Sequence, residues 1–397
     1  MSITKKELRF MITKTFIKNV EHESAIKHVT GKAIYTDDIP EPKNMLHAAI
    51  GFSPISRGTI EKIDFADVFN SDGVIDIITD KDIKGQNDVG PIFKGDKIFT
   101  SKKIEYYGQP IFAVIATSTN LARKAVLKVK LKIKKLKPIL TIEDAIKKKS
   151  FVLKSKTIKK GKASSAIKNS DHYLKGKLEC GGQDHFYLEG QIAMTIPQEN
   201  KNFLIYSSTQ HPSETQQIVA KVLDQKFNSI NVKVRRIGGG FGGKETQSFL
   251  FAAISSIAAK KLNRPVKLRI DRDDDMIMTG KRHQFIFNYE VGFSNNGKIN
   301  GLKILMASNC GISADLSGAI NDRAIYHIDN AYYIPNLELT SHRCKTNTVS
   351  NTAFRGFGGP QGMFCIENII DHISHYLKKE PSNIRIQNFY KKNSNNT

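Results

Sequence analysis

A glycine-rich stretch, RIGGGFGGKET at residues 236–246, most constrains what this chain can fold into. It follows INVKVRRI, an alternating apolar run typical of a strand, and it precedes ETQSFLFAAISSIAAKKLN, a run typical of a strongly apolar helix. A strand, a glycine loop and a helix in that order predict an α/β architecture with a ligand-binding turn.

The stretch matches two phosphate-binding motifs and fits neither of them well. Gly238, Gly240 and Gly243 give the G-x-G-x-x-G spacing of dinucleotide-binding loops, whereas Gly238, Gly243 and Lys244 begin a G-x-x-x-x-G-K P-loop. A P-loop then needs Ser or Thr to hold magnesium, but the next residue is Glu245. A carboxylate at the start of the helix also lies close to any pyrophosphate bound there, so a dinucleotide is not favoured.

A second glycine loop repeats part of the first. Gly240-Phe-Gly-Gly recurs as Gly356-Phe-Gly-Gly within AFRGFGGPQG, and each copy directly precedes an expected helix. Glycines let backbone N–H groups approach a ligand closely, and helix N-termini favour anions. The pair predicts one extended anionic ligand gripped at two places. The alternative, two tight turns without a ligand, stays open at this point.

The remaining pattern divides the chain into four segments. Residues 1–22 are expected to form a weakly ordered tail, and residues 23–140 a mixed α/β domain with strands such as MLHAAIGFS and IFAVIATS. Residues 141–172 are expected to hold a short helix, TIEDAIKKK, and a linker rich in lysine and serine. Residues 173–397 form a second region, with a helix at PSETQQIVAKVLD, a hairpin at Asn296–Gly297 and a closing helix at MFCIENIIDHISHYLKK. The predicted fold class is α/β, or more broadly α+β.

The net charge of +23 does not by itself indicate a nucleic-acid partner. Much of the lysine lies between Lys124 and Lys177, without interleaved aromatic residues for base stacking. In KAVLKVKLKIKKLK, lysines alternate with Val129, Leu131 and Ile133, which is typical of a half-buried strand with a solvated basic face. No apolar run approaches membrane-spanning length, and MSITKKELRF lacks a signal-peptide core. We therefore expect a cytoplasmic protein with neither a nucleic-acid nor a membrane partner.

The four cysteines stand far apart, and no two of them form a C-x-x-C pair. This spacing predicts reduced, mostly buried thiols rather than a disulfide framework, a zinc site or a complete iron–sulfur site. The cysteines are Cys180, Cys310, Cys344 and Cys365.

Five longer motifs resemble, in order along the chain, the molybdenum-binding subunits of the xanthine dehydrogenase family. They are GKAIYTDDIP near the start, GGQDHFYLEGQ at 181–191, SSTQHPSETQ at 207–216, RRIGGGFGGKET at 235–246 and SNTAFRGFGGPQG at 350–362. The resemblance implies an α/β hammerhead domain over residues 23–140. It implies the first part of a molybdopterin-binding domain over residues 173–397, with the second part absent.

The resemblance further implies a molybdenum hydroxylase of purine catabolism, which oxidises hypoxanthine and xanthine to urate with oxygen derived from water. Its cofactor is then molybdenum–molybdopterin with a sulfido ligand on the metal. Electrons leave through iron–sulfur centres to FAD, both expected only on partner subunits. The pterin dithiolene holds the metal in this family, so we expect no metal ligand among the side chains.

The residues that match the family's site fall into two groups. Around the cofactor, the resemblance implies a hydrogen bond from the glutamine, backbone contacts from the first loop and an arginine in the second loop: Gln210, Gly240, Phe241, Gly242 and Arg355. Around the purine, it implies a carboxyl group for ring nitrogens, an arginine for a carbonyl oxygen and a stacking ring: Glu245, Arg323 and Phe357. Because aldehyde oxidases of this fold typically lack the pair Glu245 and Arg323, purines are the expected substrates.

One departure from the family concerns the catalytic base. The family's glutamate base lies in a Gly-Glu-Pro-Pro motif of the second part, and no Gly-Glu-Pro occurs in this sequence. We therefore expect no catalytic residue within these 397 residues. Two hypotheses follow: a truncated subunit that is active only with a chain carrying the C-terminal half, or an inactive fragment of that subunit.

Overall fold

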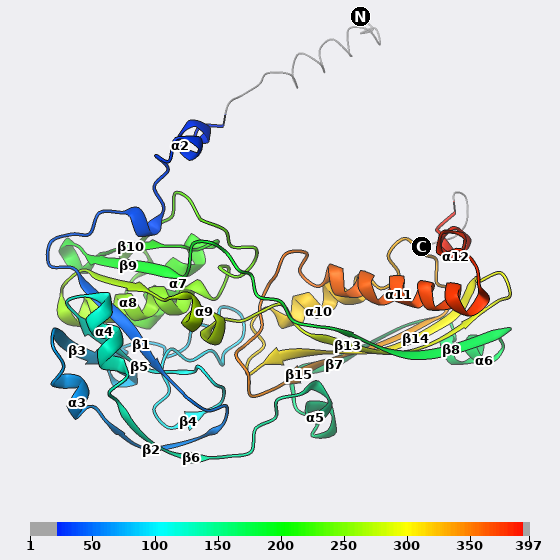
Figure 1. Ribbon diagram of the computed structural model, residues 1–397, viewed down its shortest axis with the longest axis horizontal. Helices are drawn as coiled ribbons and strands as arrows, with labels where there is room; N and C mark the ends of the chain where they lie inside the picture. Colours follow the sequence, from blue (N-terminus) through cyan, green and yellow to red (C-terminus); the bar gives the residue numbers. More distant parts are fainter. Residues whose placement is uncertain (1–21, 392–397) are drawn as a thin grey trace, which may run out of the picture.

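The computed structural model describes residues 22–391, which form two lobes (Figure 1). The larger lobe contains a seven-stranded and a three-stranded sheet, and the elongated lobe contains a five-stranded sheet (Figure 1). Helices cover the sheets in both lobes, so the predicted mixed α/β fold is confirmed. The tail predicted at residues 1–22 lies outside the described residues apart from its last residue.

The seven-stranded sheet combines strands from two distant parts of the chain. Its β1 pairs in parallel with β12, with Leu46 opposite Val266. Strands before the predicted boundary at 141–172 and strands after it therefore share one sheet. In order across the sheet the strands are β11 (Ile230–Lys233), β10 (Phe203–Ser207), β9 (Ile192–Pro197), β12 (Val266–Arg269), β1 (Leu46–Phe52), β5 (Pro110–Ala116) and β3 (Val74–Ile78).

Helices on both faces bury the centre of this sheet. Every residue of β5 is buried, because Ala113 and Ile115 join one apolar cluster while Phe112 and Val114 join another. The first cluster contains α8 (Ser248–Leu262), whose apolar surface extends nearly all round, as the sequence predicted. α7 (Pro212–Leu223) packs against α8 and begins with the expected proline. The second cluster contains α4 (Thr119–Val126), capped by the Ser118 side chain.

The lysine-rich strand lies at one edge of the three-stranded sheet. Leu131 and Ile133 are half-buried and their neighbouring lysines are exposed, so the predicted alternation is confirmed. Lys130 pairs with Asp67 at 2.7 Å, which places carboxylates opposite part of this basic face. The strands of this sheet are, in order, β4 (Lys103–Ile104), β2 (Gly58–Asp64) and β6 (Lys130–Lys135). Three further helices are α2 (Ala25–Val29), α3 (Ala66–Phe69) and α9 (Arg272–Met278).

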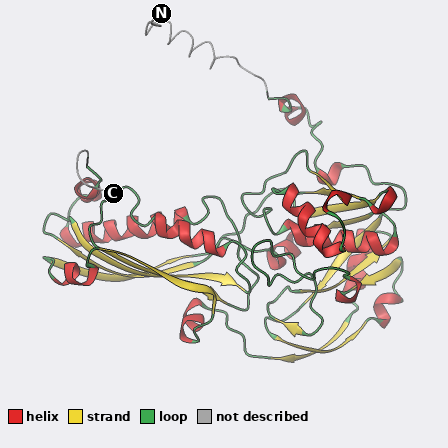
Figure 2. Ribbon diagram, turned by 180° about the vertical axis from the view of Figure 1, so that it is seen from behind, coloured by secondary structure: helices red, strands yellow, loops and turns green. Residues whose placement is uncertain are grey.

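The five-stranded sheet forms the floor of the elongated lobe, and α11 (Gly359–Leu377) lies along it (Figure 2). Phe285, Phe287 and Tyr289 alternate along β13 and pack with the isoleucines of α11 in one core. α10 (Ser317–Tyr326) and α12 (Pro381–Asn388) pack against α11. The strands are, in order, β7 (Phe151–Lys160), β15 (Leu337–Lys345), β14 (Ile299–Gly311), β13 (Phe285–Phe293) and β8 (His172–Cys180).

The linker predicted between residues 141 and 172 is wrong for most of its length. Its helix is present as α5 (Ile142–Lys147), but the lysine-rich stretch forms β7 at the edge of the five-stranded sheet and then α6 (Ala163–Lys168). Most of the β7 side chains are exposed, and backbone pairing with β15 holds the strand. An edge strand with polar side chains has the composition of a linker, and this composition concealed the strand.

Three further features can be compared with the sequence. The hairpin predicted at Asn296–Gly297 is confirmed, because β13 and β14 pair in antiparallel fashion and Gly297 has a φ of 87°. All four cysteines are free thiols, and all but Cys180 are buried. Within residues 22–391, no helix combines the length and the apolar character needed to span a membrane.

The core of the elongated lobe gives a stability prediction. Phe287 is fully buried, so Phe287→Ala should lower the free energy of unfolding by about 3–5 kcal/mol. Urea denaturation followed by circular dichroism measures this change. Phe69→Ala is the matched control, because that ring is 55% exposed and its removal should change stability far less. Equal losses in the two variants would contradict the packing described here.

Candidate functional site

The first glycine loop links β11 to α8 and carries three residues with positive φ. Gly239 has a φ of 93°, Phe241 of 53° and Gly242 of 99°. A phenylalanine in the left-handed region is unfavourable by itself, so contacts around the loop must hold it there. The Phe241 ring is 47% exposed.

Gln210 holds the inner side of this loop. The residue lies between β10 and α7, and its Oε1 accepts hydrogen bonds from the N–H groups of Gly242 (2.9 Å) and Lys244 (3.2 Å). Its own N–H donates to the Lys244 carbonyl (2.8 Å). A Cβ at Gly240 would lie 2.4 Å from Oε1, so only glycine fits beside the amide. Among the described residues, no acceptor bonds the Nε2 group of this exposed side chain, which leaves it able to donate to a ligand.

A buried ion pair holds the outer side of the loop. The Lys244 ammonium is fully buried, donates to the Glu189 carbonyl (2.7 Å) and pairs with Glu189 Oε2 (3.2 Å). The same carboxylate accepts from the N–H of Gly238 (2.8 Å), so one side chain binds both ends of the loop. Burial lowers the pKa of Lys244, and the charge of Glu189 opposes that change.

The two glycine loops contact each other directly. The Arg355 N–H donates to the Phe241 carbonyl (2.8 Å), and a Cβ at Gly242 would lie 2.7 Å from the Ala353 carbonyl. His185 Nε2 lies 2.6 Å from the same carbonyl, which the tautomer with a proton on Nε2 can satisfy. The structure therefore brings Gln210, Phe241 and Gly242 together with Arg355.

The second loop also packs on α10. Gly356, Phe357 and Gly358 have φ values of 92°, 51° and 95°, and a Cβ at Gly358 would lie 2.0 Å from the Ile320 carbonyl. α10 carries Arg323, whose side chain is exposed. Among residues 22–391, no hydrogen bond or ion pair joins Glu245 to Arg323 or Phe357, and their predicted roles toward a purine stay predictions.

Glu245 is half-buried at the end of the first loop. Burial raises the pKa of its carboxyl group, the charge of His211 opposes this, and Glu214 adds to it. A carboxyl group with a raised pKa holds a proton at higher pH than an exposed one. Chemically, such a group can donate a proton to, or accept one from, a ring nitrogen.

These contacts change the interpretation of the glycines. We expected them to make room for a ligand, but Gly238, Gly240, Gly242 and Gly358 are each filled on the Cβ side by protein atoms. The glycines let the loops pack against one another, and the backbone positions that result form the site. The residues that hold the loops, Glu189 and His185, lie in the GGQDHFYLEGQ motif, but no spacing rule assigned them this contact.

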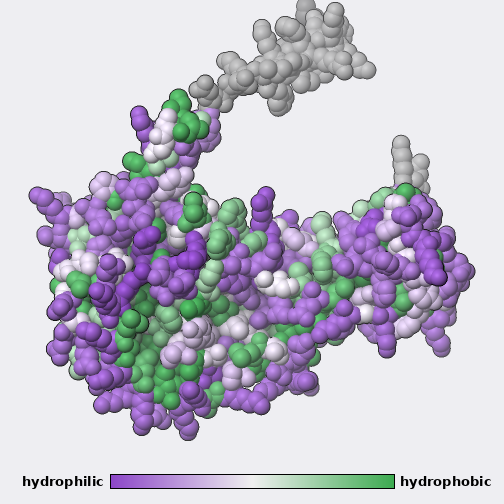
Figure 3. Space-filling model, viewed as in Figure 1, coloured by the Kyte–Doolittle hydropathy of each residue, from purple (hydrophilic) through white to green (hydrophobic). Residues whose placement is uncertain are grey.

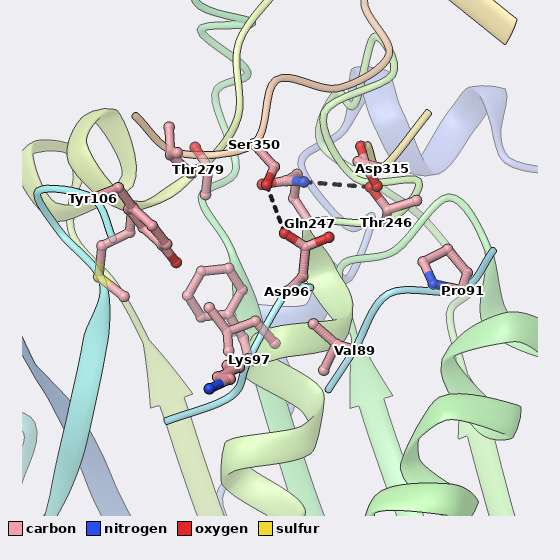
Figure 4. Close-up of a pocket in the computed structure, with 14 residues that line it drawn as sticks. Val89, Pro91, Asp96, Lys97, Tyr106, Thr246, Gln247, Thr279, Asp315 and Ser350 are labelled. Atoms are coloured by element: carbon pink, nitrogen blue, oxygen red, sulfur yellow. Dashed lines mark hydrogen bonds between the residues drawn. The ribbon is translucent and has the colours of Figure 1, made fainter. Parts of the chain in front are cut away.

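A small cavity lies next to the start of α8 and is lined by segments far apart in the chain (Figure 4). It measures about 40 Å³ and is lined by Asp96, Tyr106, Thr246, Asp315 and Ser350 among others. Asp96 accepts hydrogen bonds from Ser350 and Ser313, both at 2.6 Å, whereas buried Asp315 Oδ2 has no hydrogen-bond partner among residues 22–391. Burial raises the pKa of Asp315 to about 7, and the charge of Asp96 adds to this effect. Burial also raises the pKa of Asp96, and its hydrogen bonds with Ser313 and Ser350 oppose that rise.

A first prediction concerns the close approach of the loops. Gly242→Ala should lower the free energy of unfolding by about 1–3 kcal/mol, because its φ is positive and its Cβ would meet Ala353. Chemical denaturation measures the loss. Gly181→Ala is the control, because a Cβ there meets nothing within 4 Å. If both variants lose the same stability, the loops do not approach as described.

A second prediction concerns Asp315. Its folded pKa is raised from 3.8 to about 7, so the stabilisation by its protonated form is present below about pH 4 and is lost as pH rises toward 7. Asp315→Asn should remove that part of the pH dependence. Thermal unfolding midpoints measured from pH 4 to pH 8 give the comparison, with the exposed Asp72→Asn as control. If the midpoints of wild type and Asp315→Asn change with pH in the same way, Asp315 does not change its protonation between these pH values as predicted.

Two protein-family models match this chain. Residues 30–137 match the aldehyde oxidase and xanthine dehydrogenase a/b hammerhead domain, and residues 144–389 match the molybdopterin cofactor-binding domain. The two loops and Gln210 lie within the second match.

Xanthine dehydrogenases are similar to the chain over most of its length. The enzyme of Calliphora vicina is 40% identical over 373 residues, which are 93% of this chain and 28% of that protein. Xanthine dehydrogenase 1 of Arabidopsis thaliana is 43% identical over 373 residues, 93% of this chain and 27% of that protein. The chain thus spans a little over a quarter of the length of these relatives.

Solved structures share the fold. The aldehyde oxidoreductase of Desulfovibrio gigas matches with a TM-score of 0.87 at 26% identity, over 94% of this chain and 43% of that one. The aldehyde oxidoreductase of Desulfovibrio desulfuricans matches with the same TM-score at 25% identity, over 94% of this chain and 44% of that one. With the cofactor-binding model matched over residues 144–389, the chain belongs to the molybdopterin cofactor-binding domain family, preceded by a hammerhead domain of the aldehyde oxidase and xanthine dehydrogenase type.

Proposed function

We propose that this chain is part of a xanthine dehydrogenase and binds one side of a molybdenum–molybdopterin cofactor and the purine next to it. The observation that carries the proposal is the hydrogen bond between Phe241 and Arg355, which joins two glycine loops into one site. The family match and the xanthine dehydrogenase relatives support the cofactor and the reaction class.

The donors at the joined loops fit an anionic cofactor. Among the described residues, Gln210 is exposed with no acceptor for its Nε2 group, and the exposed Arg355 side chain forms no ion pair. An amide donor and a planar guanidinium suit oxo and phosphate oxygens. Within residues 22–391, no group of three His, Cys, Asp or Glu side chains could hold a metal ion.

The substrate side of the proposal follows from the chemistry of half-buried Glu245 and Phe357 and of exposed Arg323. The bound cofactor supplies the transfer of water-derived oxygen and accepts the electrons. Glu245, with its raised pKa, shares a proton with a purine ring nitrogen, and Arg323 stabilises charge that develops on a carbonyl oxygen. The Phe357 ring stacks on the flat purine and fixes its orientation.

The rest of the enzyme is proposed from the relatives. Because the chain spans about 28% of the Calliphora vicina enzyme, we propose that the general base and the iron–sulfur and FAD centres belong to the remaining regions, in this polypeptide or in partners. Hypoxanthine and xanthine are the proposed substrates. A cytoplasmic location stays a prediction from the sequence.

The test is metal and pterin analysis of the chain co-expressed with the regions that complete the relatives' length. We expect molybdenum and pterin to copurify in equal amounts and xanthine to be oxidised. An assembly that forms without molybdenum would contradict the proposal. Cofactor retention without turnover would instead favour the second hypothesis, an inactive cofactor-binding remnant.

A further prediction separates substrate binding from cofactor binding. Glu245→Gln and Arg323→Met should each lower kcat/KM for xanthine by about 100-fold or more, because each removes a contact to charge that develops during the reaction. Molybdenum content should stay near the wild-type value. The exposed residues Glu199 and Arg235 provide matched controls, Glu199→Gln and Arg235→Met. Loss of molybdenum in either site variant would assign that residue to the cofactor instead.

A further inference from the structure

Arg282 lies behind the second glycine loop, on the segment between α9 and β13. Its guanidinium carbon lies 3.9 Å from the centre of the Phe354 ring, and Nη2 donates to the Arg355 carbonyl (2.8 Å). The side chain therefore holds two successive residues of the loop by a cation–π contact and a hydrogen bond. The residue is 8% exposed.

Arg282 differs from the other buried cations of the described chain. Four lysine or arginine residues are buried, and three of them pair with carboxylates: Lys244 with Glu189, Lys267 with Asp37 and Glu41, and Arg343 with Asp322. Arg282 forms no ion pair within residues 22–391, and its buried Nε and Nη1 have no hydrogen-bond partner. The Nε and Nη1 groups thus lack acceptors, and the positive charge lacks a counter-ion, among the described residues.

Such an arrangement is costly for the cofactor-free chain. A buried charge loses its hydration, and the contacts with the Phe354 ring and the Arg355 carbonyl replace only part of that energy because neither is a counter-ion. Burial lowers the pKa of Arg282, but arginine keeps its proton under ordinary conditions. The Cys180 thiol is the neighbour that favours the charged form of Arg282, but burial raises the pKa of this thiol, so it supplies no full counter-charge. An anion bound near Arg282 would supply the missing counter-charge, and this would explain why the chain keeps an unpaired buried arginine.

We propose that Arg282 is the internal cation of an anion site at the second glycine loop. It positions the loop through Phe354 and the Arg355 carbonyl, and its uncompensated charge attracts an oxyanion group of the ligand held there. The proposal rests on the proposed function in one respect, that this oxyanion belongs to the molybdopterin cofactor. Arg282 is a positioning residue, because its guanidinium contacts the loop and its charge acts on the oxyanion from a distance.

The test compares cofactor content with the stability of the cofactor-free chain. In the co-expressed assembly, Arg282→Met should lower molybdenum and pterin per chain about ten-fold, and Arg282→Lys, which keeps the charge, should restore part of the loss. Arg235→Met, at a residue 65% exposed, controls for net charge and should change nothing. The thermal midpoint of the cofactor-free chain should stay equal or rise in Arg282→Met, because the variant removes an unpaired buried charge.

Two outcomes overturn the proposal directly. Wild-type cofactor content in Arg282→Met removes the role in binding. A fall in the thermal midpoint of cofactor-free Arg282→Met, together with loss of cofactor, makes Arg282 an ordinary structural residue.

An independent measurement covers the case in which wild type itself lacks molybdenum and the proposed function fails. Inorganic pyrophosphate is titrated into the cofactor-free chain by calorimetry. Binding that weakens about ten-fold in Arg282→Met, and not in Arg235→Met, supports the anion site without any reference to molybdenum. Equal binding by wild type and Arg282→Met, or no binding by wild type, rejects it.

Discussion

The hydrogen bond from the Arg355 N–H to the Phe241 carbonyl lies where the two lobes of the molecule meet. One partner follows a strand of the seven-stranded sheet, and the other follows a strand of the five-stranded sheet. The bond can form only because Gly242 lacks a Cβ and lies against Ala353. Each residue assigned to the cofactor contributes to, or is held by, this junction. The geometry of the site is therefore a property of how two cores are docked, more than of either loop alone.

Charge around the junction is distributed unevenly. The first loop is held by a paired cation and anion, Lys244 with Glu189, which lie 3.2 Å apart. The second loop is held by Arg282, a cation whose buried Nε and Nη1 have no hydrogen-bond partner in the described part of the chain. Exposed Arg355 adds a further positive charge on the same side. The first loop is thus organised for rigidity and the second for attracting an anion.

The sequence predicted the elements of the site better than its internal contacts. Two glycine loops, each before a helix, were predicted from composition and order, since a positive φ and close packing require glycine in any fold. The same reasoning could not connect Glu189 to Gly238 or His185 to Ala353, because those contacts join segments far apart in the chain. The prediction of a linker within residues 141–172 was wrong for another reason. The β7 strand there is stabilised by backbone pairing, and its lysine side chains carry no apolar signal.

The shared seven-stranded sheet has a consequence for how the chain acquires its structure. β1 and β5 are synthesised early, yet β1 needs β12, which ends at Arg269, as its neighbour on one side. A nascent chain that has emerged only through the hammerhead region exposes the unpaired edge of an apolar strand at the ribosome. Pairing over this sequence distance carries a large loop-closure entropy and is slow. The seven-stranded sheet therefore cannot be completed until the chain has been synthesised through Arg269, and the edge of β1 is open until then.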